Sequence, residues 1–290
     1  EVYPFKNFAE IKEYCKKENI RIPDLVERFE GKGIWHYLDR VWIVMNSCIK
    51  RGLAAEGELP GGLGIMRKAY MLNNRRHMDE SPETRENRLV CAYAYAVSEE
   101  NASCGEIVTA PTCGACGVLP AVLRYTADRR GFSENEIRRA IATAGIIGNV
   151  IKTNASISGA ECGCQAEIGS ASAMAAAALA ELCGASPTAS LSAAAMAVKN
   201  ILGLVCDPVA GLVECPCIKR NAMGAANAVL AADMALAGIS SIIPFDEVVG
   251  AMRSVGRLMN VDLRETARGG LAATATALEI TKNISMENED

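Results

Sequence analysis

The feature that most constrains the fold is an alanine-rich segment near the middle of the chain. Residues 165–183, "QAEIGSASAMAAAALAELC", are small and apolar on nearly every side and carry almost no charge before Glu181. A helix that is apolar all round is normally buried, and its small side chains let neighbouring helices approach closely. The sequence therefore predicts an all-α fold, a helical bundle around this segment as its central helix.

The rest of the chain agrees with an all-α fold. Half of the residues are hydrophobic but only 5% are aromatic, which favours closely packed helices over aromatic-rich strands. The weak strand candidate is "EIVTA" at 106–110. We expect one domain over 1–290, with peripheral N-terminal helices in 1–60 and a helical core in 89–283 that carries the functional site. Apolar spacing predicts the other helices at 8–20, 34–57, within 66–87, at 90–103, from about 117, and at 134–153, 191–206, 217–238, 245–260 and 271–282.

Charge and hydropathy exclude several classes of partner. The net charge is −4 and the Lys and Arg residues form no cluster beyond short pairs, so nucleic acid is not expected as a partner. No uncharged apolar run reaches the roughly 18 to 20 residues that a membrane helix needs. The N-terminal residues are charged and amphipathic, unlike a signal peptide. These features predict a soluble, cytoplasmic protein.

The chain has twelve cysteines, which is many for its length. A large core without an export signal points to reduced thiols or metal ligands. Cys164 opens the alanine-rich helix, Cys206 is expected at the end of one apolar helix, and Cys217 is expected at the start of the next. Three thiolates meeting at one buried point would leave a metal position open for a substrate oxygen. Their spacing alone does not separate a metal site from ordinary packing.

Longer motifs carry a resemblance that the spacing does not. The strings "NASISGAECGCQAEIG", "CDPVAGLVECPCIKRNAMG" and "RETARGGLAAT", with "TAPTCGACGVLPAVL" and "LPGGLGIMRKA" upstream, resemble the catalytic α chain of the iron-sulfur L-serine dehydratases over about residues 4–275. The resemblance implies an enzyme that uses no PLP and converts L-serine to pyruvate and ammonia with an oxygen-sensitive 4Fe-4S cluster. It implies Cys164, Cys206 and Cys217 as the cluster ligands.

The implied chemistry is a β-elimination, in which an open iron binds the serine hydroxyl and a base removes the Cα proton. Polar residues in the loops are expected to hold the substrate, with helix capping as their alternative role. These candidates are Asn154, Ser156, Ser158, Thr109, Thr112 and Asn221. No base is identified, because we expect His36 to pack beside Trp35 and His77 to be solvated.

The resemblance also implies a partner. The family has a β chain or β domain with a serine-rich histidine motif, and nothing like it occurs in this sequence. We therefore expect a β partner and a homo- or hetero-oligomer. An iron-sulfur L-cysteine desulfidase, an iron-sulfur redox protein and a zinc-bound helical module are the rival functions. The remaining clustered cysteines are Cys113, Cys116, Cys162 and Cys215. We expect them to be small buried or loop residues. The alternatives are a redox pair at Cys113 and Cys116 and an auxiliary cluster ligand at Cys162.

Overall fold

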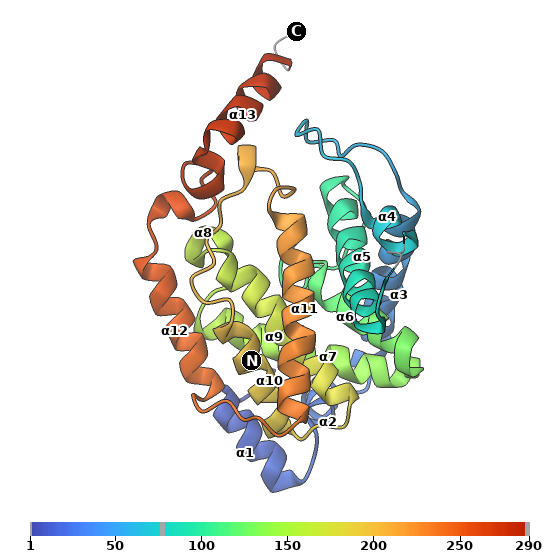
Figure 1. Cartoon of the computed structure of the whole chain (residues 1–290). Coiled ribbons are helices and arrows are strands. Elements are labelled where there is room, and N and C mark those ends of the chain that lie inside the picture. Colours follow the sequence, from blue (N-terminus) through green and yellow to red (C-terminus); the bar gives the residue numbers. More distant parts are fainter. Residues whose placement is uncertain (1, 76–78, 288–290) are drawn as a thin grey trace.

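A computed structural model of the chain describes residues 2–75 and 79–287, which form a bundle of helices (Figure 1). No strand occurs in these two ranges, where the only bridges are isolated ones at Glu58–Met66 and Cys206–Arg264. The helices are α1 (Phe8–Glu18), α2 (Ile22–Glu30), α3 (Gly33–Ala54), α4 (Ala69–Asn74), α5 (Pro82–Ala102), α6 (Val118–Arg130), α7 (Glu134–Asn154), α8 (Gly159–Cys162), α9 (Cys164–Leu182), α10 (Pro187–Lys199), α11 (Cys217–Leu236), α12 (Phe245–Leu258) and α13 (Ala275–Glu287). Three short 3₁₀ turns complete them: η1 (Val209–Gly211), η2 (Val261–Leu263) and η3 (Gly270–Ala273).

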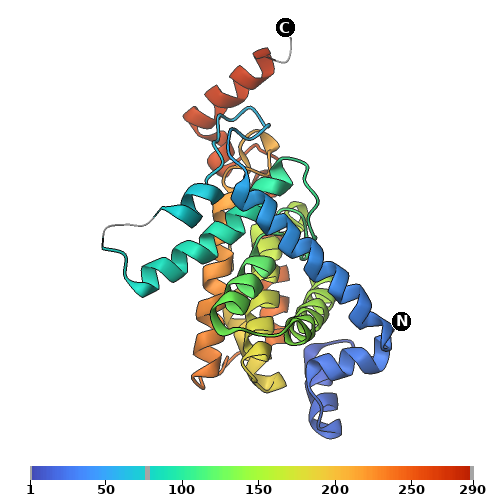
Figure 2. The same cartoon turned by 90° about the vertical axis from the view of Figure 1, so that its right-hand side faces the viewer.

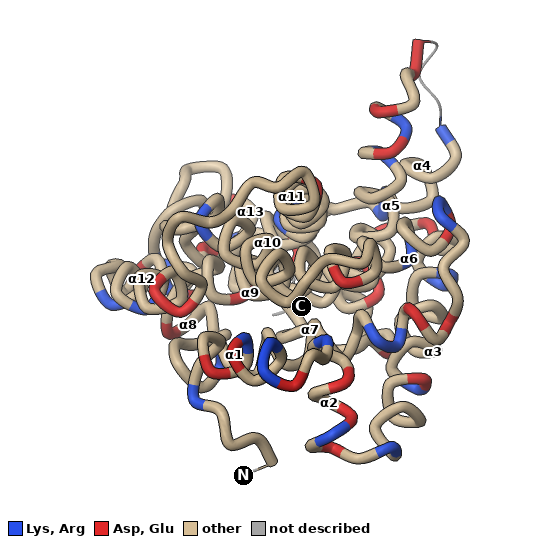
Figure 3. The backbone as a smooth tube through the Cα atoms, turned by 90° about the horizontal axis from the view of Figure 1, so that it is seen from below, with Lys and Arg blue, Asp and Glu red and all other residues tan. Residues whose placement is uncertain are grey.

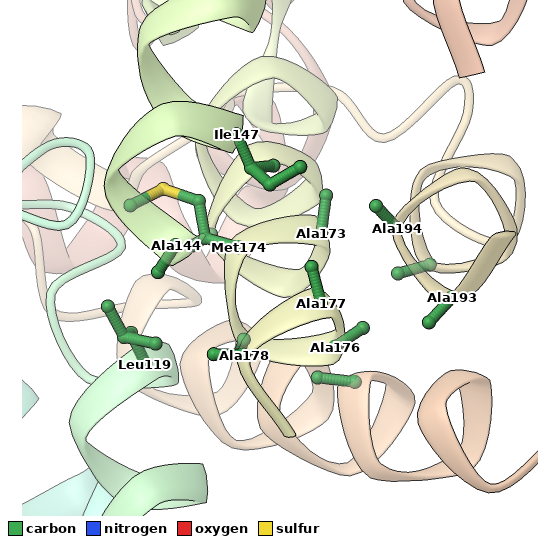
Figure 4. Packing of buried hydrophobic residues seen from close by; sticks show 14 of the residues in the cluster. Leu119, Ala144, Ile147, Ala173, Met174, Ala176, Ala177, Ala178, Ala193 and Ala194 are labelled. Atoms are coloured by element: carbon green, nitrogen blue, oxygen red, sulfur yellow. The ribbon is translucent and has the colours of Figure 1, made fainter. Parts of the chain in front are cut away.

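The alanine-rich segment is the central helix α9, as the sequence predicts. It packs against α6, α7, α10 and α11, and every residue from Ile168 to Glu181 is buried. Figure 4 shows why small residues are needed here, because Ala176 and Ala177 of α9 and Ala193 of α10 occupy the space between the two helices. Methyl groups on both sides allow this close approach.

Helix α11 crosses α9 at a glycine. A Cβ atom on Gly224 would lie 2.8 Å from Cγ2 of Ile168, so the contact admits no larger residue without a shift. The polar groups at this crossing are satisfied, since Ser172 Oγ donates to the Gly224 carbonyl at 2.9 Å and accepts from Asn227 Nδ2 at 2.8 Å. The crossing fixes how α11, and therefore its first residue Cys217, lies relative to α9.

The N-terminal helices cover the outside of this core (Figure 2). Helix α1 packs against α10 and α12, α2 against α7, and α3 against α5 and α7. Phe8 stacks on Phe245, and Asp246 of α12 accepts hydrogen bonds from the first backbone N–H groups of α1 at 2.9 Å. Charged residues of both signs are interspersed over the outer helices, whereas α9 and α10 are nearly free of them (Figure 3).

Three predicted elements differ in the structure. The segment "EIVTA" is a loop, and the helix predicted from residue 90 begins earlier, at Pro82 of α5, whereas the helix predicted within 66–87 is present as α4. Helix α10 ends at Lys199, so Cys206 lies in a loop and not at a helix end. Beyond the helix, Gly203 has φ +89° and donates its N–H to Gln165 Oε1 at 2.9 Å, which fixes the loop that leads to Cys206. None of the helices in the described ranges combines the length and hydrophobicity that crossing a membrane requires.

Candidate metal centre

The structure brings the three predicted cysteine ligands to one cavity. Cys164 is the first residue of α9, Cys217 is the first residue of α11, and Cys206 lies in the loop between α10 and η1. All three side chains are buried and line the same cavity. Two helix N-termini and one loop therefore supply the thiols, where the sequence predicted a third helix end.

Two of these thiols form a close group with a carboxylate. The Sγ atoms of Cys164 and Cys206 and a carboxylate oxygen of Glu167 all lie within 4.8 Å of one another, and no other such group of His, Cys, Asp and Glu occurs in the described part of the chain. Cys217 faces the same cavity from α11 but stands outside this closest group. The group can bind a metal ion.

The N-terminus of α9 is fixed by a glycine and a glutamine. Gly163 has φ +76°, and a Cβ there would lie 2.7 Å from Met259 Sδ and 2.8 Å from the Leu204 carbonyl. The buried Gln165 Nε2 donates to the carbonyls of Cys162 at 2.9 Å and Met252 at 3.1 Å. Because its Oε1 also holds Gly203, one side chain joins the start of α9, helix α12 and the loop that leads to Cys206.

The "RETARGGLAAT" motif holds Cys206 in place. The backbone N–H of Cys206 donates to the Leu263 carbonyl at 2.8 Å, and its carbonyl accepts from the Glu265 N–H at 2.7 Å. The neighbouring Asp207 accepts from the Leu271 N–H at 2.7 Å through Oδ2. The motif therefore positions a thiol from a distant part of the chain.

Arg220, one turn into α11, lies beside the thiols. Its guanidinium donates to the Val205 carbonyl at 2.8 Å, pairs with Asp207 Oδ1 at 2.8 Å and lies 3.6 Å from Cys164 Sγ. Arg220 therefore joins the residues on both sides of Cys206 to the first residue of α9.

The sequence analysis missed Glu167, which is the carboxylate of this close group. Thr112 Oγ1 donates to Glu167 Oε2 at 2.7 Å, and Glu167 Oε1 lies 4.0 Å from Cys206 Sγ. Two glycines make room for it, since Cβ atoms on Gly114 and Gly159 would lie 2.6 and 2.2 Å from its oxygens. The available signal was its position three residues after Cys164, which places both side chains on one face of α9.

Burial favours the neutral form of these donors, and for Cys217 this effect exceeds the opposing charge of Arg220. Burial raises the pKa of the Cys217 thiol, and a hydrogen bond with Cys164 together with burial raises the pKa of Cys206. Burial also raises the pKa of Glu167, against the hydrogen bond from Thr112. A metal centre would replace the thiol protons with its own positive charge. Three thiols and one carboxylate form a donor set that suits iron-sulfur clusters and other thiophilic metals.

Among the predicted substrate residues, Thr112 and Asn221 lie next to the centre. Thr112 orients Glu167. Asn221 is buried and its amide is committed to the backbone, because Oδ1 accepts from the Gly117 N–H at 2.9 Å and Nδ2 donates to the carbonyls of Gly114 and Cys217. This arrangement lets Asn221 fasten the "TAPTCGACG" loop to the start of α11.

None of the six candidates lines the cavity itself, and the other four have no contact with its lining carboxylate or thiols in the described hydrogen bonds. Asn154 Nδ2 donates to the Lys6 carbonyl at 2.9 Å. Ser156 Oγ pairs with the Glu161 carboxylate and accepts from the Ser158 N–H at 3.0 Å, which is a local turn before α8. Thr109 lines a separate groove of about 360 Å³ beside α2, α3 and α7. Substrate contact by these four residues stays a prediction.

The remaining cysteines are dispersed. All twelve are free thiols. Cys113 lies at the exposed rim of the cavity, whereas Cys116 is buried beside Cys48 in a small hydrophobic cluster. Cys162 packs against Gly256 of α12 and does not line the cavity. Cys215 lines a different pocket.

His36 does not line the described cavity and supplies no base there. His36 is exposed on α3, so the expectation that it packs into the bundle is wrong. Its neighbour Trp35 packs against the core, while the helical rotation turns His36 to the other side. His77 lies outside the described residues.

Comparisons with known proteins agree with these motifs. Residues 9–272 match the family described as the serine dehydratase alpha chain. The chain is 44% identical to the "Probable L-serine dehydratase, alpha chain" of Bacillus subtilis, with 97% of this chain and 95% of that protein covered. It is 43% identical to an L-serine dehydratase of Streptomyces coelicolor and 44% identical to L-serine dehydratase 1 of Escherichia coli. It spans only 61% and 62% of the length of those two relatives.

Proposed function

Because the chain belongs to the serine dehydratase alpha chain family, we propose that it is the catalytic α chain or α domain of an L-serine dehydratase. The proposed reaction is the β-elimination of water from L-serine, which gives pyruvate and ammonia without PLP. The observation that carries this proposal is the convergence of Cys164, Cys206 and Cys217 on one buried cavity. The free state of all twelve cysteines supports a reducing, cytoplasmic setting.

The donor set fits a 4Fe-4S cluster. We propose Cys164, Cys206 and Cys217 as its ligands. When bound, the cluster supplies a Lewis-acidic iron with an open position for the leaving hydroxyl. The chain supplies the surroundings, since the Arg220 guanidinium lies 3.6 Å from Cys164 Sγ and the "RETARGGLAAT" motif holds Cys206.

Glu167 is the residue of this chain best placed to move the substrate proton. Its Oε1 faces the thiols, and its Oε2 is held by Thr112, so the carboxylate has one oriented oxygen on the cavity side. We propose that Glu167 Oε1 accepts the Cα proton. Asn154, Ser156, Ser158, Thr109 and Asn221 remain proposed as residues that hold the substrate or shape the loops around it.

The comparisons support a partner. The matching Bacillus subtilis protein is named an alpha chain, and about two fifths of the length of the two longer relatives lies outside the part that this chain covers. We propose that a β chain or domain completes the enzyme, in a homo- or hetero-oligomer.

An iron-sulfur redox protein is the second candidate, and one observation favours it. Cys113 lines the same cavity as the three proposed ligands, so a fourth thiol is within the site. Four thiolates are the usual ligand set of an electron-transfer cluster. The two functions predict different cluster contents for Cys113→Ala: the dehydratase keeps its cluster, and the redox protein loses it.

The test is iron and sulfide analysis after anaerobic reconstitution of the cluster. Cys164→Ala, Cys206→Ala and Cys217→Ala are each expected to lose the bound iron and sulfide and their visible absorption. Cys116→Ala is the control with the same chemical change outside the cavity, and Cys113→Ala is expected to behave like it. Loss of the cluster in Cys113→Ala would favour the redox protein, and a colourless zinc-containing wild type would refute both.

A further inference from the structure

The cavity of the three cysteines opens to solvent on one side. Cys164, Cys206 and Cys217 lie at its buried end. Two of the residues that line it, Cys113 and Glu265, are exposed, whereas the others are buried or half-buried. These two residues therefore form the rim. A small molecule that enters the cavity from solvent passes the side chain of Glu265.

Glu265 has a backbone conformation that a glutamate rarely adopts. Its φ is +61°, in the left-handed region that favours glycine, because a Cβ atom there crowds the backbone. The Glu265 N–H donates to the Cys206 carbonyl at 2.7 Å, and the Cys206 N–H donates to the Leu263 carbonyl at 2.8 Å. Glycine would make the same backbone contacts without strain. A larger residue held in this conformation beside a cavity points to a function of its side chain.

The Glu265 carboxylate has no hydrogen bond or ion pair in the described part of the chain, although two arginines are close to it in sequence. Arg264 donates instead to the Glu161 carbonyl at 3.3 Å. Arg268 pairs with Asp262 at 3.1 Å. Because Glu265 is both exposed and unpaired, its carboxylate is accessible to a ligand.

The charges around the cavity indicate what kind of ligand group suits Glu265. Burial is the largest cause of the raised pKa of Glu167, and the negative charge of Glu265 raises it further, so both carboxylates act on the same space. The cation among the lining residues is Arg220, which already pairs with Asp207 at 2.8 Å. The rim therefore has a negative charge without a counter-charge, and a positively charged ligand group would balance it.

An organic ammonium group fits this position better than a metal ion does. Glu265 does not belong to the close group of metal-binding donors formed by Cys164, Glu167 and Cys206. Hard metal ions need several oxygen ligands, whereas an ammonium group is satisfied by one carboxylate and water. The α-ammonium is the positively charged group of L-serine, the proposed substrate.

We propose that Glu265 binds the α-ammonium group of the substrate and thereby selects amino acids over hydroxy acids that lack this group. The inference rests on the proposed function, which it extends from the reaction to the recognition of the substrate. With the ammonium group held at the rim, the rest of the molecule extends toward the buried end of the cavity, where Glu167 lies.

The test is anaerobic calorimetric titration of the cluster-loaded full chain with two probes. L-serine has the ammonium group, and 3-hydroxypropionate keeps the hydroxyl and the carboxylate but lacks it. The wild type is expected to bind L-serine roughly tenfold or more tightly than 3-hydroxypropionate. In Glu265→Gln, L-serine should bind roughly tenfold or more weakly, while 3-hydroxypropionate should bind no worse because a repelling charge is removed. Glu13→Gln, at an exposed position of α1, is the control and should match the wild type.

Glu265→Gly separates recognition of the substrate from a structural role. Glycine adopts this φ without strain, so the variant should unfold at a urea concentration at least as high as the wild type does. It should bind L-serine as weakly as Glu265→Gln, and both variants should keep the wild-type iron content. Lower stability of Glu265→Gly, or loss of iron from either variant, would assign the side chain to the fold or the cluster and overturn the proposal.

The outcomes also separate this inference from the proposed function. Equal L-serine affinity in the wild type and Glu265→Gln overturns the inference alone. Equal weakening of both probes in Glu265→Gln overturns it as well, because the change would then act on the whole cavity. A wild type that carries no cluster or binds no L-serine refutes the proposed function, and the inference fails with it.

Discussion

Glu167 shows what a single residue adds that the sequence pattern did not reveal. The sequence predicts Cys164 and Cys217 at helix starts, where a thiolate is favoured, and the family resemblance implies the full set of three with Cys206. Glu167 was not predicted, because its role depends on Thr112 and on the space at Gly114 and Gly159, which come from another loop and from the start of α8. A carboxylate inside an alanine-rich helix becomes informative only when its neighbours in space are known.

Glu167→Gln tests the proposed proton acceptor. Glutamine keeps the size of the side chain and can still accept from Thr112, so the helix content and the iron content should match the wild type. The kcat for L-serine is expected to fall by roughly 10² to 10⁴, the usual contribution of a general base. Glu247→Gln, at an exposed position of α12, is the control and should change nothing. A wild-type kcat in Glu167→Gln would exclude the proposed role.

At the scale of helices, the sequence pattern predicts a helix correctly where the residues of that helix alone determine it. Helix α9 follows from its alanine content, and α7 follows from its apolar spacing and its first-turn glutamates. The end of α10 did not follow, because Gln165 of another helix holds the loop that contains Gly203. Helix ends that depend on such tertiary contacts cannot be predicted from the local sequence pattern.

Two glycines in helices predict opposite effects of one added methyl group. Gly52 of α3 lies against α5, where a Cβ would be 2.2 Å from the Ala96 carbonyl oxygen. Because this oxygen belongs to the backbone of α5, it cannot move away without displacing the helix. Gly250 of α12 has nothing within 4 Å of that position. Gly52→Ala should lower the unfolding free energy by about 1–3 kcal/mol, and Gly250→Ala should raise it by about 0.5–1 kcal/mol. Urea unfolding followed by circular dichroism measures both, and equal shifts would contradict the packing.

The start of α7 predicts a pH dependence. Ser133 Oγ accepts from the Glu136 N–H, and Glu136 accepts from Ser133; these hydrogen bonds lower the pKa of Glu136. A lowered folded-state pKa stabilises the fold above the unfolded value of about 4.3, and this stability is lost as the pH falls through the folded-state pKa.

Glu136→Ala should therefore be less stable than the wild type at neutral pH, with a difference that narrows below about pH 4. Thermal unfolding at several pH values measures the difference. Glu13→Ala, at an exposed position of α1, is the control. A difference that stays constant from neutral to acidic pH would argue against the capping interaction.

At the scale of the whole molecule, the buried hydrophobic cluster contains side chains from α1 to α12. This supports our proposal that residues 1–290 are one domain, with the N-terminal helices as its outer layer. Exposed apolar residues gather instead at α11 and in the C-terminal part, where Ile242 is 93% and Leu258 is 87% exposed. Helix α13 stands away from the body in Figures 1 and 2. Exposed apolar surface of this kind is typical of an interaction site.

The partner proposal predicts that the isolated chain is a poor enzyme. With its cluster rebuilt anaerobically, the chain alone should deaminate L-serine little, and a separately purified β chain should raise the rate at least a hundredfold. Leu230→Glu and Leu258→Glu should weaken co-purification with the β chain without loss of helix content, because both side chains are exposed. Ile43→Glu makes the same change at an exposed position of α3 and should have no effect on that association. Full activity of the chain without a partner would refute the proposal, since nothing would then remain for a β chain to complete.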